Sequence, residues 1–160
     1  MVRPFNEIVS YLCLGSKDAV EHYPKFALVV NCTKTATADH PQKIEIPVDD
    51  TPDDCAQLFA LLCEHQVLER IHACITAKQP VLVHCRMGMQ RSAAVVACYL
   101  IKYNYMTPSS AMAFIRFKRP VAFFGGANFE RTMHAVATMA FSPDVTQHGS
   151  LGDSAILALL

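Results

Sequence analysis

The sequence predicts an α/β domain built on a central, mostly parallel sheet of roughly four to five strands flanked by helices. Short apolar runs rich in β-branched residues, such as Phe26–Asn31 and Pro80–His84, alternate along the chain with longer segments of helical periodicity. The chain has 160 residues, of which 52% are hydrophobic and 18% charged, so it suits one domain with a substantial core. Because parallel strands are usually joined by helices, we expect helices on both faces of the sheet.

Most of the strands are expected in the first half of the chain. Tyr11–Gly15 is predicted to be a short strand ending at a glycine, and Asp18–Tyr23 to be one or two helical turns stopped by a proline. Phe26–Asn31 is a continuous apolar run typical of a buried strand, whereas Lys43–Val48 alternates like a half-buried one. The polar residues between these two strands, 33–41, are expected to form a loop.

A single helix is predicted from Thr51 to about Ala77. Thr51 is a good N-cap, and Pro52 suits the first helical turn. Asp53 and Asp54 are favoured near the positive end of the helix dipole. Leucines and isoleucines that recur along the segment give the helix a broad apolar side, which should pack on the sheet.

Three further helices are expected in the second half. Ala93–Ile101 is apolar all round, which predicts a buried, central helix. Thr107–Arg119 begins with a second Thr-Pro pair, and Ala127–Phe141 is the last helix. We assign residues 1–141 to one domain. Residues 142–160, rich in Pro, Gly, Ser and Asp, are assigned to a C-terminal tail that docks or stays loose.

The charge balance argues against a nucleic-acid-binding protein. Lys and Arg number 14, as do Asp and Glu, so the net charge is zero with His neutral. Proteins that bind nucleic acid or anionic membranes through their overall charge carry a basic excess. No apolar run reaches the length of a membrane span. We therefore expect neither a nucleic-acid partner nor a membrane span, although the composition leaves room for a local basic patch.

The cysteines indicate the compartment. The chain contains seven, an odd number, and its opening segment MVRPFNEIVS lacks the apolar stretch of a signal peptide. This predicts free thiols in a reducing environment, hence an intracellular protein of the cytoplasm or nucleus. Cys63, His65, His72 and Cys74 have metal-like spacing, but on one helix the cysteines and histidines point to opposite sides. We predict no metal site there.

The segment most indicative of chemistry is HCRMGMQRS, between the strand ending at His84 and the helix beginning near Arg91. In such sheets, ligands bind beyond the carboxyl ends of the strands, where Cys85 lies. Gly88 lets the loop curl so that successive backbone N–H groups point inward, and the helix N-terminus adds positive potential. The nest predicted here suits a tetrahedral oxyanion such as phosphate.

The side chains at the two ends of this loop suit covalent catalysis. A cysteine in an electropositive nest favours the thiolate, which is a nucleophile, and a guanidinium binds two phosphate oxygens at once. Ser92 is placed to donate a hydrogen bond to the sulfur, and His84 to position the loop. No metal is needed, and the other six cysteines are assigned to the core. The predicted phosphate-binding residues are Cys85, Arg86, Met87, Gly88, Met89, Gln90 and Arg91.

This loop resembles the HCx5RS signature of cysteine-dependent protein phosphatases, specifically of the small dual-specificity type. Further segments between about Ser10 and Met139 are similar to the same family: YLCLGS, VVNCT, IPVDDT and KRPVAFFGGANFERTM. The resemblance implies a tyrosine phosphatase-like fold with residues 1–141 as the catalytic domain. PVDDT is also similar to enzymes of large DNA viruses, which hints at a viral member.

The resemblance further implies a general acid, because a departing alkoxide or phenoxide needs a proton. The family supplies an aspartate from a loop before the long helix, and the matching residue is Asp50, with Asp49 as the alternative. Asp53 and Asp54 are better explained by the helix dipole. In the implied cycle, Cys85 attacks phosphorus, Asp50 protonates the leaving oxygen, and water then hydrolyses the cysteinyl-phosphate.

Two features depart from the family's pattern. The family often has a Pro-Asn pair soon after an Arg-Pro pair, whereas RPVAFFGGANF is lengthened and rich in glycine. The asparagine expected to brace the phosphate loop is therefore displaced, and Asn128 is the candidate. Arg86 is an unusual loop residue, and it either assists acidic substrates or is simply a solvated arginine.

The expected partner is a phosphorylated protein. The segment between the second and third strands is short, so the chain lacks the extra sequence that deepens the pocket of larger tyrosine-specific relatives. A shallow cleft would admit phosphoserine and phosphothreonine as well as phosphotyrosine. Phosphoinositide or RNA 5′-phosphatase activity and a phosphate-binding module without turnover are the alternatives. A scaffold role, with the AILALL tail as a docking peptide, is compatible with catalysis.

Overall fold

The computed structural model describes residues 1–142 and is centred on a five-stranded sheet of order β1-β2-β5-β3-β4. β1 runs antiparallel to β2, and the other neighbouring pairs are parallel. This confirms the predicted α/β fold with a mostly parallel sheet. The strands are β1 (Phe5–Val9), β2 (Leu12–Gly15), β3 (Leu28–Asn31), β4 (Lys43–Glu45) and β5 (Val81–His84).

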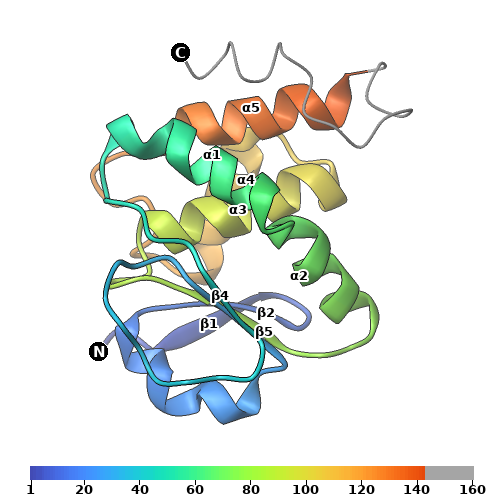
Figure 1. The fold of residues 1–160 in the computed structure, drawn as a ribbon. Helices are drawn as coiled ribbons and strands as arrows, with labels where there is room; N and C mark the ends of the chain where they lie inside the picture. The colour runs from blue at the N-terminus through green and yellow to red at the C-terminus, as the bar shows by residue number, and fades with distance from the viewer. Residues whose placement is uncertain (143–160) are drawn as a thin grey trace.

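Helices cover the two faces of the sheet unequally (Figure 1). One face carries the 3₁₀ helix η1 (Lys17–Lys25), and the α-helices lie on the opposite face. The expectation of helices on both faces therefore holds for the first of these faces only through η1, because the connection from β3 to β4 is a loop. The α-helices lie together on one side: α1 (Cys55–Glu64), α2 (Val67–Thr76), α3 (Arg91–Asn104), α4 (Pro108–Lys118) and α5 (Glu130–Phe141).

The strands divide their side chains between two cores. Val81 and Val83 of β5 join the large core beneath the α-helices, whereas Leu82 joins a small core beneath η1. Successive strand residues point to opposite faces, so this division follows directly from the backbone. Because β5 is buried on both faces, it reads as a continuous apolar run in the sequence.

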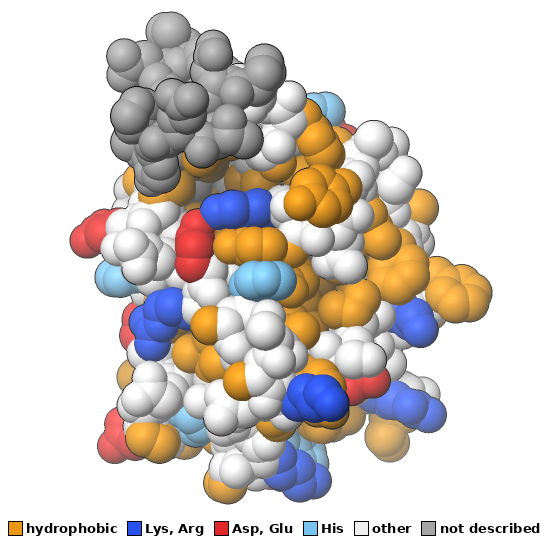
Figure 2. Space-filling model, turned by 90° about the vertical axis from the view of Figure 1, so that its right-hand side faces the viewer, with side chains coloured by type: hydrophobic (Ala, Val, Ile, Leu, Met, Phe, Trp, Pro, Cys, Tyr) orange, Lys and Arg blue, Asp and Glu red, His pale blue; other side chains and the backbone are white. Residues whose placement is uncertain are grey.

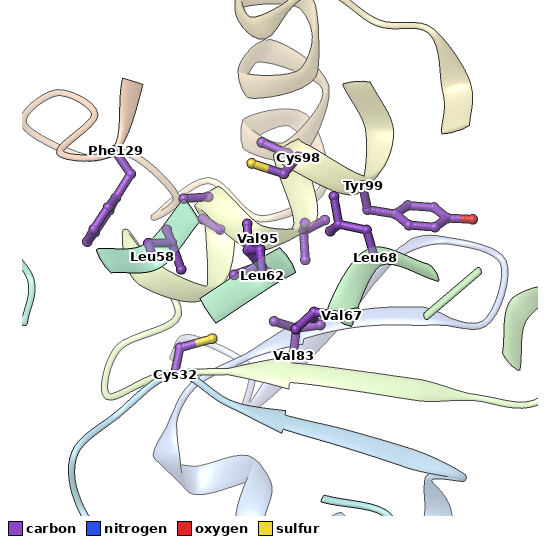
Figure 3. Close-up of a cluster of buried hydrophobic side chains, with 14 of the residues drawn as sticks. Cys32, Leu58, Leu62, Val67, Leu68, Val83, Val95, Cys98, Tyr99 and Phe129 are labelled. Atoms are coloured by element: carbon purple, nitrogen blue, oxygen red, sulfur yellow. The ribbon is translucent and has the colours of Figure 1, made fainter. Parts of the chain in front are cut away.

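The helix α3 is the centre of the large core. Every residue from Ser92 to Ile101 is buried, which confirms the predicted central helix. Figure 3 shows Val95 and Cys98 of this helix surrounded by side chains from α1, α2, β5 and the segment before α5. Packing on all sides fixes the position of the helix and hence of its first residue, Arg91, next to the loop after β5.

The long helix predicted from Thr51 to about Ala77 is broken, and the prediction of one element is wrong. Its N-cap is confirmed, because the Thr51 hydroxyl accepts a hydrogen bond from the backbone N–H of Asp53 at 3.2 Å. The first turn, η2 (Pro52–Asp54), is a 3₁₀ helix, and α1 ends before Gln66, whose φ is 49°. A left-handed residue changes the chain direction, and hydrophobic periodicity on both sides conceals it.

The first strand was absent from the sequence-based expectation. β1 is an edge strand with mixed burial, so its residues alternate too weakly to stand out. The strand expected over Lys43–Val48 is also shorter and ends at Glu45. Ile46 and Val48 are nevertheless fully buried, so the apolar pattern there reflects packing of a chain that has left the sheet.

On the face shown in Figure 2, basic and acidic side chains are interspersed among apolar ones. Lys102 and Glu69 form an ion pair between α3 and α2. Within residues 1–142, no helix has the length and apolarity needed to cross a bilayer. The predicted tail begins at Ser142, and its remaining residues lie outside the described part of the chain, as does the proposed docking peptide.

Replacing Gln66 by glycine should stabilise the fold by about 0.5–1 kcal/mol, because glycine adopts a positive φ without a side-chain clash. The Gln66 side chain is exposed and makes no capping hydrogen bond, so little is lost. Chemical denaturation of Gln66→Gly measures the change. The matched control, Gln57→Gly inside α1, should lose about 1 kcal/mol. Destabilisation of both variants would contradict the assignment of strain to Gln66.

Candidate active site

The loop between β5 and α3 lies at the carboxyl edge of the sheet. β5 has a parallel neighbour on each side, so the loop leaves the middle of the sheet. Cys85 is the first loop residue and only 2% of its surface is exposed. The N-terminus of α3 follows at Arg91, and its unpaired backbone N–H groups direct positive potential toward the loop.

The sulfur of Cys85 is held by two hydrogen bonds. The backbone N–H of Gly88 donates to it at 3.3 Å, and the hydroxyl of Ser92 donates at 3.1 Å. Both donors favour negative charge on sulfur. Ser92 thus occupies the position predicted for it, beside the sulfur and at the start of α3.

Gly88 cannot be replaced without moving the loop. Its φ is +66°, in the left-handed region. A Cβ at this position would lie 2.6 Å from the carbonyl oxygen of Gly15 and 2.8 Å from Nη2 of Arg119. Glycine is therefore needed at this position for two reasons: the loop curls through a positive φ, and β2 approaches the loop closely.

Arg91 closes the loop opposite the sulfur. Its Nη1 donates to the carbonyl oxygen of Val48 at 3.3 Å, which orients the guanidinium. Its Nε is buried and has no hydrogen-bond partner, alone among the buried side-chain nitrogen and oxygen atoms of residues 1–142. A buried cationic donor without an acceptor is costly, so this atom is suited to an anion in the cleft.

Both ends of the loop open into one cleft of about 510 Å³. Asp50 lies on its wall, from a segment distant in sequence. The predicted loop residues are therefore brought together with the predicted acid, except that Gly88 turns its N–H to the sulfur and does not line the cleft wall. The lining residues are Asp50, Cys85, Arg86, Met87, Met89, Gln90, Arg91, Phe124, Gly125 and Asn128.

His84 lies beneath the loop and is fully buried. Its Nε2 is 2.6 Å from the hydroxyl of Tyr23 in η1, and its Nδ1 is 3.5 Å from the carbonyl oxygen of Cys85. Burial lowers the pKa of His84, so the ring is neutral at physiological pH. The imidazole thus contacts the backbone of the first loop residue, and it does not line the cleft.

The structure distinguishes the two candidate acids. The carboxylate of Asp50 accepts a hydrogen bond from the Asn128 side chain at 2.9 Å and lies on the cleft wall. Asp49 points elsewhere, since its carboxylate pairs with Lys34 at 2.6 Å. Asp54 accepts from the backbone N–H of Asp49 at 2.7 Å, within the turn that precedes α1. Geometry therefore favours Asp50.

Arg119, which the sequence did not single out, braces the loop. It is 1% exposed and comes from the end of α4. Its Nε donates to the carbonyl oxygen of Gly88 at 3.0 Å and its Nη2 to that of Met87 at 3.1 Å. Its Nη1 is anchored by the Asn6 side chain at 2.8 Å and by the carbonyl oxygen of Arg3. In the sequence, the one indication of a role for Arg119 was its place in KRPVAFFGGANFERTM, a segment similar to the family.

The side chain of Asn128 does not brace the phosphate loop, contrary to the prediction. It holds Asp50 instead, through the carboxylate and through the backbone oxygen at 3.3 Å. The contact with the loop is made by Gln90, whose amide donates to the Gly126 carbonyl oxygen at 2.6 Å and accepts from the backbone N–H of Asn128 at 3.0 Å. The asparagine of the lengthened glycine-rich segment therefore contacts the candidate acid through its side chain.

None of the other six cysteines lines the cleft. Cys13, Cys32, Cys55 and Cys98 are buried, and Cys63 and Cys74 are partly buried. Burial raises the pKa of the Cys13 thiol to about 11, with a smaller contribution from Glu7. Burial likewise raises the pKa values of Cys32 and Cys98, so these thiols are protonated at neutral pH.

The four residues weighed as a metal site do not converge. His72 stacks on Tyr103 and its ring nitrogen lies 3.1 Å from the hydroxyl of Tyr99. Cys63 and Cys74 belong to different helices, α1 and α2. Over residues 1–142, no three or more His, Cys, Asp and Glu side chains are grouped as a metal would require.

The family model "Dual specificity phosphatase, catalytic domain" matches residues 11–138. The chain belongs to this family. The match includes the whole of the cleft described above, from Asp50 to Asn128.

The chain is also similar to individual proteins and, in its fold, to solved structures. The chain is 34% identical over 81 residues to "Phosphatidylglycerophosphate phosphatase PTPMT1" of Arabidopsis thaliana, covering 50% of this chain and 23% of that protein. It is 28% identical to protein 123R of Invertebrate iridescent virus 6, covering 81% of this chain and 94% of that protein. The crystal structure of human DUSP28 superposes with a TM-score of 0.71 at 24% identity, covering 86% and 95% of the two chains. The chain spans less than half the length of the first curated relatives it matches.

Substituting Arg119 by lysine should lower the phosphatase activity proposed below about 10- to 100-fold, because a lysine ammonium lacks the planar fork that contacts the two loop carbonyls and the Asn6 and Arg3 anchors together, so the loop amides shift. Circular dichroism monitors the thermal unfolding of the variant. The rate is then measured at a temperature at which the variant is folded. Arg116→Lys, an exposed arginine in the same helix, is the matched control and should retain activity. Full activity in Arg119→Lys would contradict the bracing role.

Proposed function

We propose that this domain hydrolyses phosphate monoesters on phosphotyrosine and on phosphoserine or phosphothreonine of proteins, through a cysteinyl-phosphate. The observation that carries the proposal is the shared cleft. The Cys85 sulfur, the unpaired Nε of Arg91 and the carboxylate of Asp50 come from separate elements and meet around one concavity. A nucleophile, an anion clamp and an acid are the parts that phosphoryl transfer to sulfur needs.

The first step transfers the phosphoryl group to sulfur. The thiolate of Cys85 attacks phosphorus while the bond to the ester oxygen breaks. Asp50, protonated at this stage, gives its proton to the departing oxygen and becomes a carboxylate. Arg91 and the loop amides bind the three remaining oxygens, whose charge is greatest in the transition state. The thiolate and the guanidinium together supply nucleophile and charge stabilisation, so no metal ion is required.

The second step returns sulfur to its thiolate state. Water attacks the phosphorus atom of the cysteinyl-phosphate, and the Asp50 carboxylate accepts the proton of that water. The bond between phosphorus and sulfur breaks, and inorganic phosphate is released. The Ser92 hydroxyl, 3.1 Å from the sulfur, stabilises the departing thiolate.

Charge around the cleft favours a protein substrate over a lipid or RNA. The segment carrying Asp50 also holds exposed Asp53 and Asp49, the latter paired with Lys34. On the loop, Arg86 is the exposed basic residue. Anionic membranes and RNA attract surfaces of positive charge. Similarity to the Arabidopsis phosphatidylglycerophosphate phosphatase makes lipid hydrolysis the second candidate.

The seven unpaired thiols support an intracellular location for the enzyme.

A panel of four substrates tests the proposal. Purified protein is given a phosphotyrosine peptide, a phosphothreonine peptide, a phosphoinositide and a 5′-triphosphate RNA, with a chelator present. We expect turnover of both peptides and loss of at least about a thousandfold in Cys85→Ser, because the nucleophile is removed. Retained activity in Cys85→Ser, or dependence on a metal, would contradict the mechanism. Faster turnover of the lipid or RNA would replace the proposed substrate class.

Substituting Asp50 by asparagine should slow hydrolysis in proportion to how poorly the leaving group departs. An alkyl or phenyl ester needs protonation and should lose about 10²–10⁴-fold, whereas an ester with a strongly acidic leaving group should lose far less. Steady-state rates over a series of aryl phosphates give the dependence. Asp49→Asn is the matched control, one residue away and ion-paired to Lys34. An equal effect of both substitutions would show that Asp50 is not the acid.

A further inference from the structure

Two large apolar side chains stand exposed at the mouth of the cleft. Phe124 is 75% exposed and Met87 is 56% exposed, and both line the same cleft as Cys85. The sulfur lies at the base, almost wholly buried, whereas these side chains lie at the rim. Exposed aromatic residues next to a concave site are the typical anchors of recognition surfaces.

The backbone holds Phe124 in a defined position. Its neighbour Phe123 is buried, and the Phe123 N–H donates to the carbonyl oxygen of Met89 at 2.8 Å. The next turn is closed by a 3.1 Å hydrogen bond from the Gly126 N–H to the Phe123 carbonyl oxygen. The amide of Gln90 donates to the carbonyl oxygens of Phe124 and Gly126. The exposed ring is therefore presented on a braced turn, which lowers the entropic cost of binding.

The turn itself depends on unusual backbone angles. Phe123 has a φ of 57°, and Gly125 and Gly126 have φ values of 80° and 113°. A positive φ in a bulky residue is costly, so the surrounding hydrogen bonds must maintain it. Strain of this kind concentrates at ligand-binding sites, and its effect here is to bury Phe123 while turning Phe124 outward.

Acidic residues also border the cleft. Asp50 lines the cleft and Asp53 is exposed in the same segment, whereas the carboxylate of Asp49 is paired with Lys34. A rim that carries carboxylates beside its apolar side chains is unfavourable for an anionic membrane, because insertion of Phe124 would bring Asp50 and Asp53 toward lipid phosphates. The same rim suits a peptide whose apolar side chain contacts the ring.

We propose that Phe124, together with Met87, is a specificity-determining residue that binds a large apolar side chain adjacent to the phosphorylated residue of a protein substrate. This inference rests on the proposed protein phosphatase function and narrows its substrates. Contact of an aromatic ring with a leucine-sized side chain favours the apolar substrate by about tenfold in kcat/KM. The phosphate still binds in the loop, so recognition and chemistry use different residues of one cleft.

The test uses two phosphotyrosine peptides that differ only in having leucine or serine on both sides of the phosphorylated residue. Wild type should favour the leucine peptide about tenfold, and Phe124→Ala should reduce this preference to about one- to twofold. The ratio is taken within each variant, so a general loss of activity cancels. The matched control is Phe117→Ala, which removes a phenylalanine that is 81% exposed on α4 and does not line the cleft, and it should keep the wild-type ratio.

The same ratio is measured as dissociation constants in the Cys85→Ser background, where no turnover is needed. A wild-type preference near one, or an unchanged preference in Phe124→Ala, would overturn the proposal. The proposal would also be overturned if Phe124→Ala weakened binding to phosphoinositide vesicles and left peptide binding unchanged, which would indicate that Phe124 inserts into a membrane. If the wild type turns over no ester, the proposed function fails, whereas the binding ratio still decides the role of Phe124. Circular dichroism melting confirms that each variant is folded.

Discussion

The phosphate site depends on where the carbonyl groups of its loop point. Four consecutive carbonyl oxygens, from Arg86 to Met89, accept hydrogen bonds from groups outside the cleft. Lys17 N–H binds the first at 3.1 Å, Arg119 binds the next two, and Phe123 N–H binds the last. Because each peptide unit is planar, a carbonyl held outward turns the following N–H inward. The Gly88 N–H, which reaches the sulfur of Cys85, is the visible result.

This constraint explains why so much of the chain serves a short loop. The three residues that bind these four carbonyls come from the start of η1, the end of α4 and the turn after it, and Arg119 is itself anchored to Asn6 in β1. Inward amides, the α3 N-terminus and Arg91 then concentrate positive potential where the sulfur lies. The sheet fixes one end of the loop through β5, and burial of α3 fixes the other. The edge strand β1 has an additional role, as an anchor for the brace.

The sequence was most informative where the relevant contacts are local. A buried strand, a loop with cysteine and arginine at its ends, and an apolar helix follow one another directly, so Cys85, Arg91 and Ser92 could be predicted from spacing. Asp50 required the family resemblance, because nothing in its neighbourhood distinguishes it from Asp49. What distinguishes them in the structure is Asn128, far along the chain, which holds only Asp50.

Residues that act through distant contacts could not be predicted. An arginine is normally exposed, so burial of Arg119 against carbonyls of the phosphate loop leaves no trace in composition or periodicity. The break at Gln66 is hidden for a related reason, since apolar residues continue on both sides and only the backbone angle marks it. The edge strand β1 shows the same limit, because half-burial weakens the alternation by which strands are recognised.

Gln90 links the acid, the rim and the phosphate loop into one unit. Its amide oxygen accepts from the Asn128 backbone, and the Asn128 side chain holds Asp50. Its amide nitrogen holds the turn that presents Phe124. Gln90, directly before Arg91, thus helps to position both Asp50, the proposed acid, and Phe124, the proposed specificity residue. Asp50 and Phe124 are therefore both held in place relative to the same residue of the phosphate loop.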